Sequence, residues 1–323
     1  MPRLGYPIPT FDDPGVAKGD IFRGTAESAK AAEEGGFDTV LVMDHFYQLP
    51  GLGAPDNSML ECYTLLAALA QHTTKVRLGA LVTGNTYRNP AILAKCLTTL
   101  DHASGGRAQL GIGTGWFELE HDAFGIEFGT FTDRFAKLEE ALQIILPMLR
   151  GERPSFAGEH YTAKDAINEP APLSTIPVMI GGSGERKTLR MVAQYADLGK
   201  LTCGPDEVPR KVEALAGHCE RLGRDRSEIT LSWNRAVCIG ETTAEAESDR
   251  DAFLATRGLD YGNLPEEIQA IIDSALVIGD VDMIGETFTE WKALGVDGFT
   301  VSMPAQGHTP EKVRLLGRVL GAI

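Results

Sequence analysis

Two adjacent side chains that can exchange protons follow an apolar run in the first part of the chain. The segment VLVMDHF places Asp44 and His45 directly after residues with the pattern of a buried strand. Histidine gains or loses a proton near neutral pH, and a neighbouring carboxylate can orient its ring or polarise a bound amide. We therefore expect Asp44 and His45 to be the reacting pair. The alternative is a histidine that is merely hydrogen-bonded at the end of a strand.

A glycine-rich turn joins another apolar run to an amphipathic helix. The segment VMIGGSGERKTLRMV contains Gly181, Gly182 and Gly184, and apolar residues with a helical period follow them. Unpaired backbone N–H groups at a helix N-terminus attract anions, and glycine lets an anion approach the backbone closely. We expect a phosphate at the turn from Gly182 to Glu185, helped by the Ser183 hydroxyl. A tight turn that needs glycine only for its backbone angles is the alternative.

A third glycine-containing turn, in the segment GIGTGW, is a weaker signal. Its residues Gly113, Thr114, Gly115 and Trp116 could let a flat ligand or its phosphate arm pass near the backbone. The turn does not fit the dinucleotide pattern G-x-G-x-x-G, and the chain contains no P-loop motif. A histidine and two glutamates follow the turn, but their spacing is irregular and H-E-x-x-H is absent. We therefore expect no metal site.

Eight apolar segments, separated by helices or loops, must position these residues. They span 3–9, 33–45, 73–84, 104–115, 174–182, 194–204, 226–240 and 293–304. Most are short and apolar throughout, as parallel strands covered by helices are. Strict alternation with eight strands predicts an α/β protein of the (β/α)8 TIM-barrel form. A doubly wound open sheet needs fewer strands and would leave the last units unexplained.

The whole chain, 1–323, reads as a single barrel domain with two insertions, at about 151–175 and 240–282. The first is loop-like and rich in proline and alanine. The second carries eleven acidic and two basic side chains, so we expect a solvated helical insertion. Such insertions at strand ends commonly shape a substrate mouth.

Composition excludes several classes of partner. The net charge of −15 disfavours nucleic acid and anionic membranes, and no apolar stretch is long enough to span a bilayer. The five cysteines are scattered without a C-x-x-C pair, and the N-terminus lacks the apolar core of a signal peptide. We therefore expect a cytoplasmic protein that acts on a small molecule.

Barrel enzymes place their chemistry where strands end. The strand ends at Asp44–His45, Leu81–Pro90, Gly113–Trp116 and Gly181–Gly184 are consecutive, so they would line one side of the mouth. A coenzyme-free aldolase or isomerase would instead need a lysine at a strand end. Lys200 is the single candidate of that kind, and nothing else in the sequence supports it.

These blocks resemble a known family. VMDHF, LGALVTGNTYRNPAILAK, LDHASGGRAQLGIGTGWFELEHDAFG and IPVMIGGSGERKTLRMVAQYAD are similar to segments of the luciferase-like monooxygenase superfamily, in the same order. More narrowly, they resemble its coenzyme F420-dependent oxidoreductases of actinobacterial type. The resemblance implies a (β/α)8 barrel that transfers a hydride between coenzyme F420, a deazaflavin, and a small organic substrate. An FMN-dependent monooxygenase that uses dioxygen is the alternative on the same fold.

The resemblance also implies roles for individual residues. Asp44 would contact the polar edge of the deazaflavin ring, and His45 would exchange a proton with the substrate. A bulge with a non-proline cis peptide would support the ring; the matching positions are Ala80, Leu81 and Val82, with Thr83 next. The coenzyme-binding set is completed by Gly113, Thr114, Gly115, Trp116, Gly181, Gly182, Ser183, Gly184 and Glu185.

One departure bears on the substrate. Glucose-6-phosphate dehydrogenases of this family carry a catalytic glutamate where this chain has Trp116, and their tryptophan after the Asp-His pair is missing. We therefore expect a flatter, more apolar pocket and the reduction of an activated C=C, C=N, C=O or nitroaromatic group. Alcohol oxidation in reverse would use the same site. The resemblance further implies a homodimer.

Overall fold

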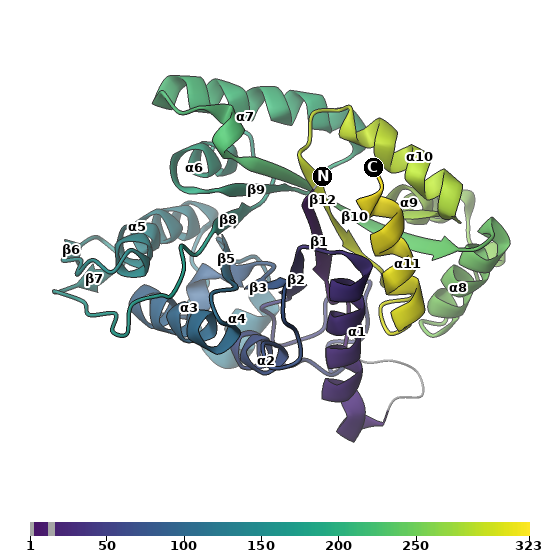
Figure 1. Cartoon of the computed structure of the whole chain (residues 1–323), viewed down its shortest axis with the longest axis horizontal. Coiled ribbons are helices and arrows are strands. Elements are labelled where there is room, and N and C mark those ends of the chain that lie inside the picture. Colours follow the sequence, from purple (N-terminus) through teal and green to yellow (C-terminus); the bar gives the residue numbers. More distant parts are fainter. Residues whose placement is uncertain (1–2, 12–16) are drawn as a thin grey trace.

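The chain forms a closed barrel of parallel strands surrounded by helices (Figure 1). The computed structural model describes residues 3–11 and 17–323. Around the barrel the strands are β1 (Arg3–Pro7), β2 (Thr39–Val42), β3 (Arg77–Ala80), β5 (Ala108–Gly113), β8 (Val178–Gly181), β9 (Leu198–Leu201), β10 (Thr230–Gly240) and β12 (Gly298–Ser302). Strand β12 pairs with β1 and β10, and β10 also pairs with β9, which closes the ring. The (β/α)8 barrel predicted from the sequence is confirmed.

Helices cover the outside of this barrel, because each presents an apolar stripe to the strands. They are α1 (Ile21–Gly35), α2 (Cys62–Leu69), α3 (Pro90–Ser104), α5 (Phe131–Leu149), α6 (Thr188–Tyr195), α7 (Val208–Leu222), α10 (Val281–Lys292) and α11 (Pro310–Gly321). The short α4 (Glu118–Phe124) follows β5. Single 3-10 turns are η1 (Lys18–Asp20), η2 (Asn85–Tyr87), η3 (Pro205–Glu207), η4 (Arg226–Glu228) and η5 (Tyr261–Asn263).

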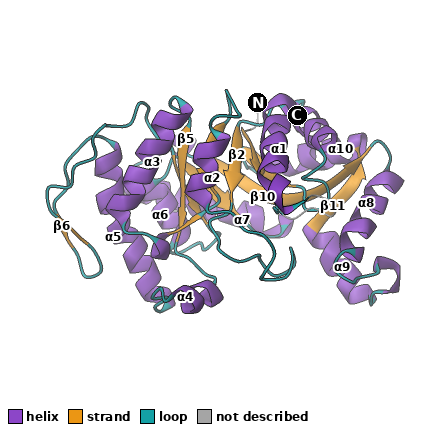
Figure 2. Cartoon of the chain, turned by 90° about the horizontal axis from the view of Figure 1, so that it is seen from below, coloured by secondary structure: helices purple, strands orange, loops and turns teal. Residues whose placement is uncertain are grey.

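Both predicted insertions contain strands that the sequence patterns did not indicate. The first holds a small antiparallel hairpin, β6 (Phe156–Ala157) with β7 (Thr162–Ala163). The second holds α8 (Thr243–Ala255), α9 (Glu266–Ala275) and the strand β11 (Leu276–Asp280). The expectation of a helical acidic insertion therefore holds for α8 and α9 and is wrong at β11. The physical reason is that β10 runs on beyond the barrel, and β11 pairs with its extended half, residues 236–240 (Figure 2).

The third barrel position is split in two. Strand β3 ends at Ala80, β4 (Thr83–Gly84) follows, and the Leu81–Val82 peptide between them is cis, at the place that the family resemblance predicted. A Cβ on Gly113 or on Gly181 would lie 2.8 Å from a methyl carbon of Val82. These glycines therefore make room for the Val82 side chain. This contact within the protein requires glycine at both positions, independently of any ligand.

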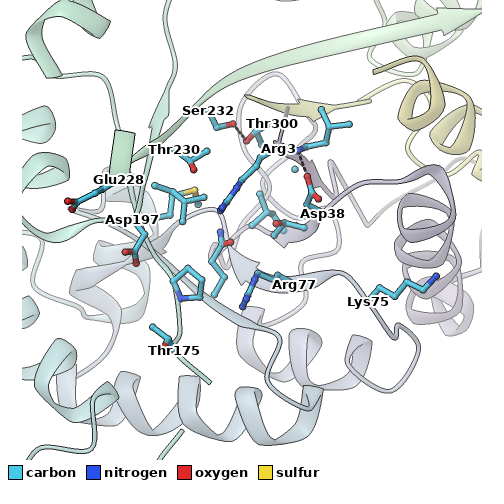
Figure 3. A pocket seen from close by; sticks show the side chains of 18 residues that line it. Arg3, Asp38, Lys75, Arg77, Thr175, Asp197, Glu228, Thr230, Ser232 and Thr300 are labelled. Atoms are coloured by element: carbon cyan, nitrogen blue, oxygen red, sulfur yellow. Dashed lines mark hydrogen bonds between the residues drawn. The ribbon is translucent and has the colours of Figure 1, made fainter. Parts of the chain in front are cut away.

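Apolar side chains divide the space inside the barrel. Leu41, Met179 and Leu198 pack together, with Leu81 and Val82 against them, and we call these five residues the lumen cluster. A pocket of about 660 Å³ opens toward the amino-terminal strand ends (Figure 3). Leu41, Met179 and Leu198 of the lumen cluster form part of its wall. His45 and the glycine turns lie at the opposite, carboxyl-terminal ends. The lumen cluster therefore separates this lower pocket from the mouth.

The packing around the split strand predicts a large effect of one methyl group. A Cβ on Gly111 would lie 2.0 Å from the Ala80 carbonyl oxygen, which is backbone and cannot move aside cheaply. We expect Gly111→Ala to lower the free energy of unfolding by about 2–3 kcal/mol, as overpacking does. Urea denaturation measures this. Gly24→Ala is the control, because nothing lies within 4 Å of its Cβ on α1; a helical glycine of this kind gains about 0.5–1 kcal/mol as alanine.

Candidate active site

His45 is held by a buried glutamate that the sequence patterns did not select. Its Nδ1 lies 2.9 Å from Oε2 of Glu120, on the first turn of α4, and the Glu120 side chain is fully buried. A carboxylate accepts only, so Nδ1 carries the proton in this bond. Among the described residues, Nε2 of His45 has no partner. The pair therefore leaves one ring nitrogen available for proton exchange, as in other carboxylate–histidine arrangements.

Glu120 also organises the loop that carries His45. It accepts hydrogen bonds from the backbone N–H groups of Phe46 and Tyr47 and from the Tyr87 hydroxyl. Burial acts to raise the pKa of this carboxyl, but the hydrogen bonds from His45, Tyr87 and Tyr47 outweigh it and hold the pKa below its ordinary value. Glu120 is therefore a carboxylate at neutral pH, and it orients His45.

Asp44 does not contact Glu120, the partner of His45, and forms an ion pair with Arg88 instead. Arg88 approaches its carboxylate in a bidentate manner, with Nη1–Oδ2 at 2.7 Å and Nη2–Oδ1 at 2.9 Å, and Gly84 donates its N–H to Oδ2 at 3.1 Å. Arg88 also reaches Glu61, the residue that caps α2, and lies over the Tyr63 ring. Burial raises the pKa of Asp44, and the Arg88 guanidinium opposes that rise. Asp44 thus ties the end of β2 to β4 and α2.

Aromatic rings form one wall beside His45. The His45 and Trp116 rings meet edge to face with centroids 5.6 Å apart, and Trp116 stacks on Phe117 at 5.1 Å. Trp116 is 57% exposed, so it presents a broad apolar face to solvent. A flat, unsaturated ligand would gain contact area against this face.

The glycine turn after β8 differs in detail from its prediction. Gly182 has φ +124°, which favours glycine, but α6 begins only at Thr188. The Ser183 hydroxyl donates to the Thr202 carbonyl at 2.8 Å and accepts from its N–H at 2.6 Å, so it ties the turn to the next strand end. In the part of the chain that the structure describes, the N–H groups of 183–186 donate to no protein acceptor. These backbone donors remain free for an anion.

A buried cation, Lys211 of α7, contacts this turn. Its ammonium donates to the Ser183 carbonyl at 3.0 Å and lies 3.5 Å from Glu185. Glu185 is also paired with Arg210. Arg186 and Lys187, which follow the turn directly in the sequence, are exposed instead. Positive charge therefore reaches the turn from a helix that sequence proximity did not suggest.

The remaining predicted site residues fall into three groups. Ala80 and Thr83 are fully buried, and the Thr83 hydroxyl pairs with Tyr63 at 2.6 Å, behind the strand. Thr114 and Gly115 are partly exposed at the end of β5 beside Trp116. Leu81 and Val82 belong to the lumen cluster that underlies the mouth. The structure therefore brings His45, Trp116, Val82 and the β8 turn to the same end of the barrel, and it directs Thr83 elsewhere.

A second cavity lies at this end of the molecule. It has a volume of about 1280 Å³ and is bounded by the loop 51–57, by α8 and α9, and by 304–309 after β12. Most of its lining is aliphatic or aromatic, including Phe253, Ile268 and Ile271. The acidic insertion thus turns an apolar side toward the mouth.

Glu120 and Arg88 are the site residues that the sequence analysis missed. Glu120 stood in the segment FELEHDAF, where it was considered only as part of a rejected metal cluster. The signal was available in principle, because an acid in the first turn after strand β5 can reach the neighbouring strand end. Among the described residues, no group of His, Cys, Asp and Glu is suited to a metal, and no helix is long and apolar enough to cross a membrane.

These observations define a (β/α)8-barrel protein with a histidine–glutamate pair and a free set of backbone donors at its carboxyl-terminal mouth. Within that class, the chain belongs to the luciferase-like monooxygenase family, whose model matches residues 3–298.

Two curated relatives illustrate the range of the family. The chain is 33% identical over 204 residues to an F420-dependent glucose-6-phosphate dehydrogenase of Microbacterium testaceum, covering 61% of this chain. It is also 33% identical over 214 residues to the pyrimidine monooxygenase RutA of Caulobacter segnis, covering 64% of this chain. The chain spans 59% of the length of each of these relatives.

The fold matches solved structures over its full length. A coenzyme F420-dependent tetrahydromethanopterin reductase from Methanopyrus kandleri superposes with a TM-score of 0.78, covering 99% of both chains at 20% identity. At this identity the likeness concerns the fold alone.

The Asp44–Arg88 pair predicts a clear effect on stability. We expect Arg88→Met to lower the free energy of unfolding by about 3–5 kcal/mol, because it leaves the Asp44 carboxylate buried without a counter-charge, with the Gly84 N–H as its remaining donor. Asp44→Asn combined with Arg88→Met should recover part of this loss. Urea denaturation near neutral pH is the measurement. Arg150→Met, which breaks the exposed Arg150–Glu152 pair, is the control and should cost less than about 1 kcal/mol. Equal losses in the two single variants would contradict the buried-pair interpretation.

Proposed function

We propose that this protein is an F420-dependent oxidoreductase that transfers a hydride between the deazaflavin and a small organic substrate. The observation that carries the proposal is the His45–Glu120 pair beside the Trp116 face, at the same barrel end as the free N–H groups of 183–186. The similarity to an F420-dependent dehydrogenase supports the choice of coenzyme. An FMN-dependent monooxygenase is the second candidate, and the equal identity to a pyrimidine monooxygenase supports keeping it.

The residues at the mouth fit such a coenzyme. The N–H groups of 183–186 and the Lys211 ammonium would hold its phosphate. The Asn85 side chain, after β4, is buried with neither its Oδ1 nor its Nδ2 bonded. An amide left in this state is costly, so it favours a polar ligand edge nearby. Leu81, Val82 and Trp116 would contact the ring system, and Asp44 would act through the position of β4.

The mechanism then assigns a task to each protein group. When bound, the coenzyme supplies a hydride donor or acceptor. Nε2 of His45 delivers a proton to the substrate atom that becomes negatively charged, or removes it in the reverse direction. Glu120 holds the imidazole in one tautomer and stabilises its charged form. The Trp116 face and the apolar side of the insertion exclude water and favour unsaturated or aromatic substrates over sugar phosphates.

The proposal includes two properties of the whole protein. All five cysteines are free, which supports a reducing compartment such as the cytoplasm. A homodimer is supported by exposed apolar side chains on α4 and at the start of α5, namely Leu119, Phe124 and Phe131.

Coenzyme titrations test the proposal directly. We expect F420 to quench tryptophan fluorescence at low concentration and FMN to do so only weakly, because Trp116 would lie beside the ring while Trp233 is buried in the core. Trp116→Phe should remove most of the signal and identify its source. Tight binding of FMN together with feeble binding of F420 would favour the monooxygenase, and oxygen consumption would then become the assay.

Turnover of the loaded enzyme separates proton transfer from binding. We expect His45→Ala to lower kcat by about 10²–10⁴ with coenzyme affinity unchanged, because the residue acts on the substrate. Glu120→Gln should lower kcat less and shift its pH profile, since the amide cannot stabilise a charged imidazole. Enones, imines and nitroaromatics are the substrates to screen. Unchanged kcat in His45→Ala, or turnover of sugar phosphates alone, would contradict these assignments.

A further inference from the structure

Lys200 is a partly buried amine that the proposed chemistry leaves unused. It lies on β9, with Gly181 of β8 and Ser232 of β10 as its register partners. The preceding residue, Gly199, faces outward, because a Cβ there would lie 3.0 Å from Val192 of α6. Successive residues of a strand point to opposite faces, so Lys200 points into the barrel.

Two contacts confirm this direction and give the height of Lys200 in the barrel. Leu198, two residues earlier, belongs to the lumen cluster. A Cβ on Gly181 would lie 2.8 Å from Val82 of the same cluster, so Gly181 faces the inside of the barrel. Lys200, its register partner on β9, faces the same side. Lys200 is therefore one inward position closer to the mouth than Leu198, and it is level with Gly181 and Val82. The lower pocket in Figure 3 contains Leu198 in its wall and does not contain Lys200.

In the described part of the chain, the surroundings of Lys200 hold no counter-charge. Its inward neighbours are Gly181, the hydrogen-bonded hydroxyls of Ser232 and Thr300, and the apolar lumen cluster. Among the described residues, no carboxylate and no hydrogen-bond acceptor pairs with its ammonium. Burial is the sole cause that lowers the pKa of Lys200, from 10.5 to about 7. The amine is thus largely neutral just above neutral pH, which is the state that a low-dielectric site favours.

We propose that Lys200 is a second anion-binding residue of the barrel mouth, protonated when an anionic ligand occupies the lumen beside Gly181 and Lys200. The empty site holds a neutral amine. When the anion enters, the amine takes one proton from solvent and the resulting ammonium forms an ion pair with the ligand; no covalent bond forms or breaks. Coulomb attraction in the barrel interior stabilises this pair far more than it would in water.

Two ligands can carry this charge, and the shared chemistry is a delocalised anion. One is the ring system of the coenzyme, and this assignment rests on the proposed function. The other is a planar carboxylate of the size of a substrate. Proton uptake separates them, because it is measured for each ligand alone and without turnover.

The experiment is calorimetric titration in two buffers of different ionisation enthalpy, at about pH 8. We expect the wild-type protein to take up close to one proton per F420 bound, and to take up none at about pH 5.5, where Lys200 is already charged. In Lys200→Met the uptake should vanish, and affinity at about pH 6 should fall tenfold or more. Above the pKa the wild-type affinity should decline with pH, whereas that of the variant should stay level.

Controls keep the result interpretable. Lys95→Met replaces a lysine whose ammonium donates to the Glu169 carbonyl on the surface, and it should behave as wild type. Thermal unfolding of Lys200→Met should show an unchanged or raised Tm, because methionine fills the same space without an ionisable group. The same calorimetric titration is repeated with benzoate in place of F420, without coenzyme. Benzamide, its uncharged analogue, is the control ligand and should cause no proton uptake.

The outcomes distinguish the two proposals. Proton uptake on benzoate binding, together with no binding of F420, would contradict the proposed function and leave Lys200 as part of a substrate site. Uptake with F420 alone assigns Lys200 to the coenzyme. Binding of both anions without proton uptake, uptake that persists in Lys200→Met, or failure of both anions to bind the wild-type protein would overturn the role of Lys200.

Discussion

Two buried carboxylates, Asp44 and Glu120, govern the organisation of the mouth. Each would be costly in the interior unless every oxygen found a donor, and each finds donors on several loops. Asp44 draws in Arg88 and the N–H of Gly84, while Glu120 draws in His45, Tyr87 and the backbone that follows β2. The loops after β2 and β4 are therefore held by charge satisfaction as much as by apolar packing. The orientation of His45 is a consequence of that constraint.

The split third strand is the second feature on which the mouth depends. The chain at Leu81–Val82 brings a branched side chain against β5 and β8, and those strands accept it because they carry glycine at Gly113 and Gly181. Gly111 leaves room for the Ala80 carbonyl. Leu81 and Val82 also form the upper side of the lumen cluster, so packed apolar side chains close the barrel interior below the mouth. A ligand at the carboxyl-terminal end therefore meets side chains that the barrel itself holds rigidly.

The mouth is also uneven around its circumference. Polar and aromatic groups collect over β2, β4, β5 and β8, whereas the insertion after β10 contributes an apolar wall through α8 and α9. The strand β11 makes this possible, because it anchors the insertion to the extended end of β10. An acidic surface on the outside and an apolar side toward the mouth are compatible in one amphipathic segment. Such an arrangement gives the mouth one polar side and one apolar side.

The sequence by itself determined the barrel, the strand ends that meet at its mouth, and the position of His45 and the β8 turn among those strand ends. These follow from local signals: uniformly apolar strands at regular spacing, glycine where the backbone must turn, and a proton-exchanging residue at a strand end. Only the tertiary structure decided that Glu120 is the partner of His45, that Arg88 neutralises Asp44, and that Ser183 binds Thr202. Each of these contacts joins residues from different βα units, 19 to 75 positions apart for Ser183 and His45 respectively. Pairing over such distances depends on the register and twist of the closed barrel, which residue type and short-range spacing do not encode.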